Sequence, residues 1–155
     1  MTNQDVINKL DAHVVHSYGR FPVAFEKGRG AKLWDFDGKE YIDFSSGIGV
    51  NSLGLAQADW AKAIYDQALR LGHISNLYYT EPCASVAETL CARTGMDKVF
   101  FANSGAESNE GAIKLARKYS YDRYGSGRST VVTLRNSFHG RTVTTLAATG
   151  QNVFH

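Results

Sequence analysis

The segment Ser104-Gly105-Ala106-Glu107 has the residue types of a helix start that can bind an anion. Ser104 with Glu107 three residues later forms a capping box, in which the two side chains satisfy free backbone N–H groups at the start of a helix. Such a helix end also offers free N–H groups and the positive end of the helix dipole, and Gly105 and Ala106 leave room for a bound group. From these residues alone, plain capping and phosphate binding both stay open.

A second group of candidate residues, Phe138-His139-Gly140-Arg141, follows an apolar run further along the chain. An aromatic ring beside a phosphate-binding helix end suits a flat heteroaromatic ligand that carries a phosphate. The planar guanidinium of Arg141 suits a carboxylate. Taken singly, Phe138 also fits a core aromatic, His139 a surface histidine and Arg141 a solvated residue at a helix start. The functional interpretation depends on whether the two segments meet.

The elements that must bring these segments together follow from the apolar pattern. We predict a buried strand over 98–102, a helix over 104–122, a second strand over 130–134 and a further helix over 141–148. Strand, helix and strand in this order predict a parallel pair with a right-handed crossover, in an α/β fold. Loops that follow parallel strands emerge at the carboxyl edge of the sheet, so both segments are expected to face one crevice.

Residues 1–54 have a different sequence pattern and are predicted to form an N-terminal segment of their own. A weak helical pattern in the first 20 residues ends at a break over 18–22. Runs of β-forming residues between 23 and 44, with the turn signal Asp37-Gly38, predict a small antiparallel meander. The Gly- and Ser-rich run 45–54 is too irregular for a regular element and suits close approach of the backbone to another group.

Residues 55–155 are predicted to be the first part of a larger ligand-binding domain. Two amphipathic helices open this part, over 57–71 and 81–93, with Gly72 as the stop of the first and Thr80 as the N-cap of the second. Cys83 and Cys91 fall in the second helix, about 12 Å apart at 1.5 Å per residue, which is too far for a disulfide. Both are expected to be small core residues.

Composition excludes several classes of function. The 155 residues carry 17 Lys+Arg against 15 Asp+Glu, a net charge of +2, so the basic excess typical of nucleic-acid binding is missing. No apolar stretch approaches the roughly 20 residues of a membrane span, and a cytoplasmic protein is expected. The histidines lack metal-ligand spacing, and motifs for nucleotide triphosphates, dinucleotides or hydrolases do not occur.

The runs 104–110 and 138–141 together resemble the motifs of the class III (ornithine-type) pyridoxal-phosphate aminotransferases. Further similarity lies in the runs 18–22, 33–35, 38–44, 46–51, 76–79 and 146–150. The resemblance implies the fold type I architecture of pyridoxal-phosphate enzymes, with the small N-terminal meander followed by the first part of the large-domain sheet. It implies pyridoxal 5′-phosphate as the cofactor.

The resemblance also implies roles for individual residues. The cofactor phosphate would bind the helix start, and the pyridine ring would stack on Phe138. The cofactor side would be formed by Ser104, Gly105, Ala106, Phe138, His139 and Glu110. Arg141 would bind the substrate α-carboxylate, and the rest of the substrate side would be formed by Tyr18, Gly47, Val50 and Asn51.

For an intact enzyme, the resemblance implies a cytoplasmic homodimer that moves an amino group from N-acetylornithine to 2-oxoglutarate in arginine biosynthesis. Ornithine, succinyl-diaminopimelate and 4-aminobutyrate stay open as donors. Members of the family are more than twice as long, and no lysine here stands in the context of their Schiff-base lysine. The aspartate that pairs with the pyridine nitrogen and the small C-terminal domain are also missing. By itself the chain is therefore expected not to transaminate, and an inert fragment is the alternative interpretation.

Overall fold

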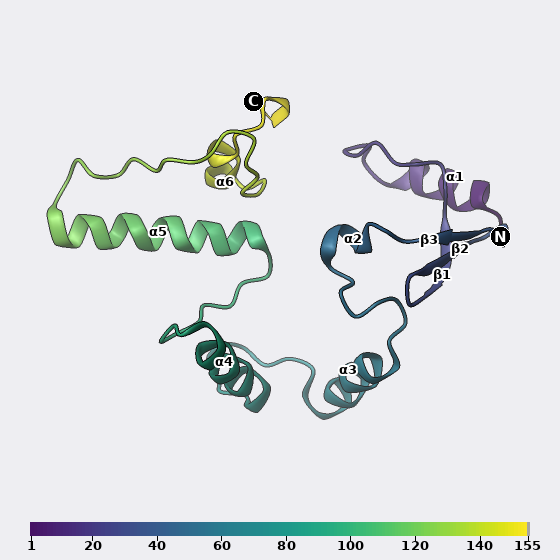
Figure 1. The fold of residues 1–155 in the computed structure, drawn as a ribbon, viewed down its shortest axis with the longest axis horizontal. Helices are drawn as coiled ribbons and strands as arrows, with labels where there is room; N and C mark the ends of the chain where they lie inside the picture. Colours follow the sequence, from purple (N-terminus) through teal and green to yellow (C-terminus); the bar gives the residue numbers. More distant parts are fainter. Residues whose placement is uncertain (155) are drawn as a thin grey trace. The chain divides into compact units, whose positions relative to one another are not determined.

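The computed structural model describes residues 1–154, which divide into two compact units with the boundary between Tyr78 and Tyr79. We call them the N-terminal unit and the C-terminal unit. Figure 1 labels their helices and strands. The predicted boundary between residues 54 and 55 concerns the domains of a longer protein, and it stays a prediction.

The N-terminal unit begins with helix α1 (Asn3–His13), so the weak helical pattern is confirmed. Its start is a capping box, because Asp5 N donates to the Thr2 hydroxyl at 3.2 Å and Thr2 N donates to the Asp5 carboxylate at 2.8 Å. The helix ends before the predicted break over 18–22.

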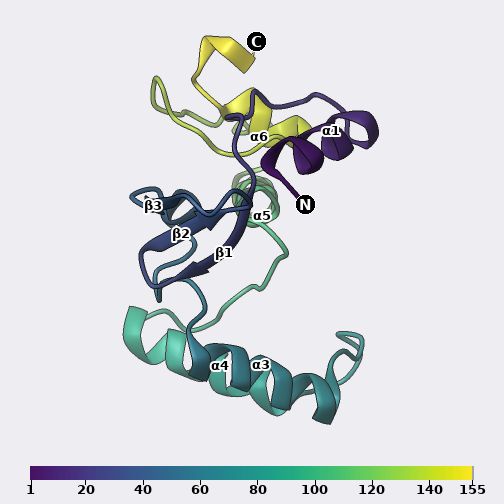
Figure 2. The same cartoon turned by 90° about the vertical axis from the view of Figure 1, so that its right-hand side faces the viewer.

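Three strands form the predicted meander: β1 (Phe25–Arg29), β2 (Lys32–Asp35) and β3 (Glu40–Ile42). They pair antiparallel in the order β1-β2-β3, and Figure 2 shows them side by side. In the turn between β2 and β3 only Gly38 has a positive φ, of 84°, whereas a two-residue hairpin turn would need it at both central positions. The turn is instead closed by Gly38 N, which donates to the Asp35 carbonyl at 3.1 Å.

The glycine-rich run after the meander is a tight left-handed turn. The structure assigns a short helix, α2 (Ser46–Gly49), but Gly47 and Ile48 both have φ of 62°. An Ile in this region is strained, because its branched Cβ crowds the backbone. Helix α3 (Ala58–Leu71) follows, with the Gln57 side chain as its cap. Gly72 closes it in a right-handed conformation, so the stop does not use the conformational freedom of glycine.

The C-terminal unit is helical. It contains α4 (Glu81–Thr94), ended by the left-handed Gly95, then α5 (Gly105–Tyr124), α6 (Val143–Ala148) and a 3₁₀ turn, η1 (Asn152–Phe154). The three predicted helices are present, although α6 begins two residues later than expected. Figure 1 shows α6 beside the first half of α5, and these two helices pack against each other.

The two predicted strands of the C-terminal unit are wrong for this structure. Residues 98–102 and 130–134 are extended but pair with no strand in the described part of the chain. Phe100 and Val132 are exposed instead of buried, at 72% and 90%. A strand persists through its ladder of hydrogen bonds, and the local apolar pattern does not supply the edge on which that ladder forms.

Few side chains are buried in either unit. Among residues 1–154 the buried side chains are Ala24, Asp35, Thr145 and Thr149, three of them polar. Cys83 is exposed and Cys91 half-buried; both are free, as predicted, but Cys83 is not a core residue. In the described part of the chain, no helix has the length and apolar character needed to cross a bilayer.

Candidate functional site

The start of α5 is the first half of the candidate site. The Ser104 hydroxyl accepts from Glu107 N at 3.2 Å, as a helix cap does. The Glu107 carboxylate accepts from Asn103 N at 2.7 Å. In the predicted capping box it would accept from Ser104 N, so the observed donor is one residue earlier in the chain. Gly105 N and Ala106 N have no acceptor among the described residues, because the first amides of a helix lack partners within it.

The second half of the site, the segment 138–141, lies against this helix start. Gly140 has φ of 132°, and a Cβ added to it would lie 2.6 Å from Ala106 Cβ and 2.9 Å from Ala106 Cα. Only glycine fits so close an approach. The predicted convergence of the two segments is therefore confirmed within the C-terminal unit.

Helix α5 also binds this segment through two polar side chains. Asn109 Nδ2 donates to the His139 carbonyl at 2.8 Å. The Glu110 carboxylate accepts from the Thr142 hydroxyl at 2.6 Å and from Thr144 N at 3.2 Å. The hydrogen bond from Thr142 is the largest of the effects that hold the pKa of Glu110 below its ordinary value. The carboxylate is thus ionised and fixed at the start of α6.

Three threonines continue this network into the interior. The Thr142 and Thr145 hydroxyls lie 2.6 Å apart, and Thr142 N donates to Thr145 Oγ1 at 3.1 Å. The Thr149 hydroxyl donates to the Thr145 carbonyl at 2.8 Å and accepts from His139 N at 3.1 Å. Because Thr145 and Thr149 are fully buried, these bonds hold the backbone on both sides of Gly140 in one conformation.

Sequence reasoning missed these threonines. Thr142 and Thr145 stand three residues apart at a helix start, which is the spacing of a cap, and this spacing was the available signal. Thr149 carries no comparable signal, because its contacts with His139 N and the Gly140 carbonyl span ten and nine residues and depend on the fold.

The aromatic and charged side chains of the segment form a small stack. The Arg141 guanidinium carbon lies 5.7 Å from the centre of the Phe138 ring and 5.6 Å from that of Phe154. The two rings are 5.8 Å apart and tilted by 53°. Phe138 is half exposed, so one part of its ring is open to a ligand. A guanidinium held over aromatic rings is also well placed to pair with an anion.

His139 contributes an unusual buried atom. Its Nε2 is buried and has no hydrogen-bond partner among the described residues. A buried polar atom without a partner is costly, and such atoms are rare in folded proteins.

The remaining predicted residues belong to the N-terminal unit. Tyr18 and Val50 are exposed, and the Arg20 guanidinium lies 6.0 Å from the centre of the Tyr18 ring. A Cβ on Gly47 would lie 3.1 Å from Asn51 Nδ2, so the left-handed turn folds back on Asn51. Their place on the substrate side stays a prediction.

Comparisons with known proteins identify the family of the chain. The family model for class III aminotransferases matches residues 14–155. An acetylornithine aminotransferase of Haemophilus ducreyi is 58% identical over 152 residues, which are 97% of this chain and 39% of that protein. The crystal structure of an acetylornithine aminotransferase from Elizabethkingia anophelis superimposes with a TM-score of 0.82 at 33% identity, over 92% of this chain and 36% of the other.

A third comparison includes the cofactor. The taurine:2-oxoglutarate aminotransferase of Bifidobacterium kashiwanohense, in complex with pyridoxal phosphate and glutamate, superimposes with a TM-score of 0.87 at 31% identity. The match covers 99% of this chain and 34% of that one. The chain thus spans about two fifths of the length of the curated relatives it matches.

Proposed function

Because this chain belongs to the class III aminotransferase family, we propose that it forms the phosphate- and ring-binding part of a pyridoxal-phosphate site. The observation that carries the proposal is the contact of Gly140 with Ala106, which brings the aromatic segment onto the free amides of α5. In this proposal the chain acts within a longer aminotransferase.

The residues present fit the cofactor. The Gly105 and Ala106 amides are free donors at a helix N-terminus, where a phosphate is favoured. A Cβ added at Gly105 would meet no atom within 4 Å, so space is open there. The half-exposed Phe138 ring offers a face for the pyridine ring.

Each residue then has a separate task. The Ser104 hydroxyl and the two amides would hold the phosphate, and Phe138 would hold the ring in one plane. Arg141, in the stack with Phe138, would pair with a substrate carboxylate through its planar fork. When bound, pyridoxal phosphate supplies an electron sink for the amino-group chemistry, which also needs a lysine amine at the cofactor. The lysines of this chain do not match that position, so the proposal places the chemical step in the longer enzyme.

Among donors we favour N-acetylornithine, with 2-oxoglutarate as acceptor, in arginine biosynthesis. Support comes from the curated relatives, which are acetylornithine aminotransferases at 48–58% identity. Ornithine, succinyl-diaminopimelate and 4-aminobutyrate are the competing donors. A cytoplasmic homodimer belongs to the same proposal, and apolar side chains exposed in both units, such as Phe44, Ile48 and Val132, are available for association. Assaying the longer enzyme with all four donors tests the preference.

Cofactor binding is testable on this chain directly. Pyridoxal phosphate should bind at least about tenfold more tightly than pyridoxal, because the helix start recognises the phosphate. Phe138→Ala should weaken binding by about tenfold through loss of ring stacking. Phe101→Ala is the matched control, since this ring is exposed to a similar extent and lies outside the site. Fluorescence titration measures all three affinities.

Two results would contradict the proposal. Equal affinity for pyridoxal and pyridoxal phosphate would exclude phosphate recognition at α5. Equal losses in Phe138→Ala and Phe101→Ala would exclude specific stacking. Borohydride treatment adds a check on the lysines, because a stable reduced adduct on one defined lysine would show that the chain carries a reactive lysine after all.

A further inference from the structure

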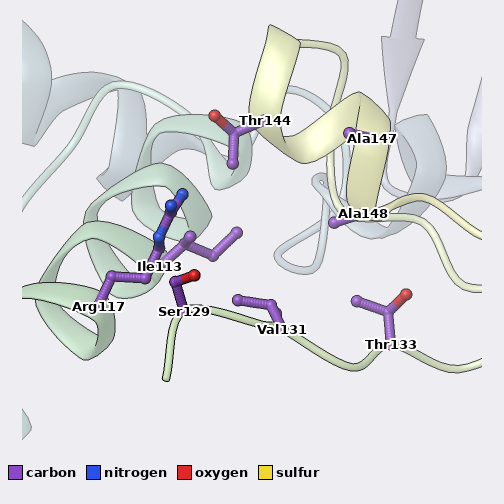
Figure 3. Close-up of a pocket in the computed structure, with 8 residues that line it drawn as sticks. All are labelled: Ile113, Arg117, Ser129, Val131, Thr133, Thr144, Ala147 and Ala148. Atoms are coloured by element: carbon purple, nitrogen blue, oxygen red, sulfur yellow. The ribbon is translucent and has the colours of Figure 1, made fainter. Parts of the chain in front are cut away.

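The Glu110 carboxylate joins α5 to the start of α6. It accepts from the Thr142 hydroxyl at 2.6 Å and from Thr144 N at 3.2 Å, and these residues lie 32 and 34 positions later in the chain. The two other acidic residues of α5 bond within or beside their own helix. In Figure 3 Thr144 lies at the start of α6, on the side that faces Ile113 of α5. Glu110 thus holds a second helix and takes no part in the cap of its own.

The hydroxyl protons behind Glu110 can run in one direction only. An ionised carboxylate only accepts, so it takes the single hydroxyl proton of Thr142. The Thr142 and Thr145 hydroxyls lie 2.6 Å apart, and Thr145 must therefore be the donor of that pair. Thr142 N donates back to Thr145 Oγ1 at 3.1 Å. Both the side chain and the backbone of Thr142 are therefore fixed, with Glu110 at the accepting end of the network.

This network is complete within the C-terminal unit. Thr145 is fully buried there, so water does not reach its hydroxyl to replace a lost partner. Removal of the Glu110 acceptor would leave the Thr142 proton without that partner and let both hydroxyls reorient. The position of Thr142 thus depends on Glu110.

Arg141 lies between two residues that α5 holds in place. On one side Gly140 contacts Ala106, where a Cβ added to Gly140 would lie 2.6 Å from Ala106 Cβ. On the other side Thr142 is bound by Glu110. Ala106 and Glu110 are four residues apart, so they lie on one face of α5, one turn from each other. This face therefore fixes the backbone on both sides of Arg141, whose side chain is exposed.

We infer that Glu110 is a positioning residue for Arg141 and acts on it through Thr142. By fixing the residue that follows Arg141, it sets the point from which the guanidinium reaches the substrate carboxylate. The inference rests on the proposed function, in which Arg141 binds that carboxylate. It assigns Glu110 no contact with the cofactor, because the carboxylate is bound to the start of α6.

Steady-state kinetics of the longer enzyme test this role. An amino acid and a 2-oxo acid both carry the carboxylate that Arg141 binds. Glu110→Ala should therefore raise KM for both substrates together, by about tenfold, with a much smaller change in kcat. Glu110→Gln should restore most of the loss, because its amide oxygen can still accept from Thr142. A purely structural role would reduce the amount of active enzyme, which lowers kcat and leaves both KM values unchanged, and this result would overturn the inference.

Matched variants control the test. Asp122→Ala removes a negative charge from the same helix, but its partner is Lys118, so both KM values should stay unchanged. An equal rise in this variant would show an effect of net charge and contradict the inference. Thr142→Val should reproduce the effect of Glu110→Ala, whereas Thr142→Ser keeps the hydroxyl and should not. This pair tests the same link if Glu110→Ala does not fold.

The failure of this inference can be told apart from the failure of the proposed function. If Arg141→Lys leaves both KM values unchanged, Arg141 does not bind the carboxylate, and the proposed role of Arg141 fails together with the inference. If Arg141→Lys raises both KM values but Glu110→Ala does not, the inference alone is overturned.

A measurement on this chain reads the position of Arg141 without substrate or cofactor. The Arg141 guanidinium carbon lies 5.7 Å from the centre of the Phe138 ring, so the Nε–H signal of Arg141 in ¹H–¹⁵N spectra depends on the ring beside it. Glu110→Ala should move this signal toward the position of a free arginine, and Glu110→Gln should leave it close to that of the unsubstituted chain. An unmoved signal in Glu110→Ala would show that Glu110 does not position Arg141.

Discussion

The two units are both organised around buried polar groups, but they satisfy those groups differently. In the N-terminal unit the Asp35 carboxylate accepts from Asn3 Nδ2, Asp37 N, Lys39 N and the Tyr41 hydroxyl, at 2.8–3.1 Å. All four donors belong to the unit itself. In the C-terminal unit the threonine network is complete inside, whereas the Gly105 and Ala106 amides and His139 Nε2 have no partner among the described residues.

This difference separates a structural cluster from a binding site. Asp35 and its four donors, which we call the Asp35 cluster, join α1 to the turn of the meander. The cluster has no donor left for a ligand. The Asn3 side chain strengthens the junction, because its Oδ1 also accepts from Ala24 N at 3.2 Å and Phe36 N at 3.3 Å. The C-terminal network fixes the backbone around Gly140 and leaves free donors beside it, which is what a preorganised site requires.

Replacing Gly140 by alanine should have the largest effect. The added Cβ would lie 2.6 Å from Ala106 Cβ and 2.7 Å from Thr145 Oγ1, at a φ of 132°. Overpacking and backbone strain together should cost about 3 kcal/mol of stability in the C-terminal unit. Urea unfolding measures this loss, and pyridoxal phosphate affinity should fall with it.

Gly95→Ala is the matched control for Gly140→Ala. Gly95 also has a positive φ, of 72°, in the left-handed helical region, but a Cβ there would meet no atom within 4 Å. Its cost should be limited to the conformational strain, about 1–2 kcal/mol. Equal costs for the two variants would mean that the contact between Gly140 and Ala106 contributes nothing.

The next largest effect should come from Asp35→Ala, which tests whether the Asp35 cluster is structural. The variant leaves the Tyr41 hydroxyl and the Asn3 amide without their acceptor in a half-buried place. The urea midpoint of the N-terminal unit should fall by roughly 1 M. Pyridoxal phosphate binding at α5 should stay unchanged, and a loss of binding would contradict the division of tasks between the units.

Many structural features of the two units are predictable from local sequence signals. Helices α3, α4 and α5 follow from apolar spacing and from caps such as Ser104, because helical contacts join residues close in the chain. The meander follows from short β-forming runs around Asp37-Gly38. The approach of the segment 138–141 to α5 was predicted from the order of the elements, and the structure shows it at Gly140 although the predicted strands are not formed.

The missed features depend on contacts between distant residues. The extended segments 98–102 and 130–134 have the composition of strands but find no pairing edge in the described chain. Asp35 is separated from Asn3 by 32 residues, and neither residue type signals burial. Phe138 was predicted as a stacking residue, but its contact with Phe154 joins residues that only the fold brings together.

A smaller effect should appear in the pH dependence of the N-terminal unit. Burial alone would raise the pKa of Asp35, but the hydrogen bonds from Asn3, Lys39, Tyr41 and Asp37 outweigh it and lower the pKa. Since the folded pKa lies below the unfolded one, this contribution to stability is present above the unfolded pKa, about 3.9, and is lost as the pH falls through the folded pKa. Urea midpoints between pH 6 and pH 2 should show this decline, and Asp35→Asn should lack that part of it.

The smallest effect compares two helix caps. Ser104 caps α5 with a hydrogen bond to Glu107 N, whereas Thr80 stands at the N-cap of α4 without any side-chain cap bond. Ser104→Ala should therefore cost about 1 kcal/mol, and Thr80→Ala only a few tenths. Urea unfolding resolves the two values.

In addition, Ser104→Ala should weaken pyridoxal phosphate binding, because its hydroxyl belongs to the proposed phosphate site. Thr80→Ala should leave that affinity unchanged. If Ser104→Ala lowers stability but not affinity, the hydroxyl is a cap alone and the phosphate is held by the Gly105 and Ala106 amides.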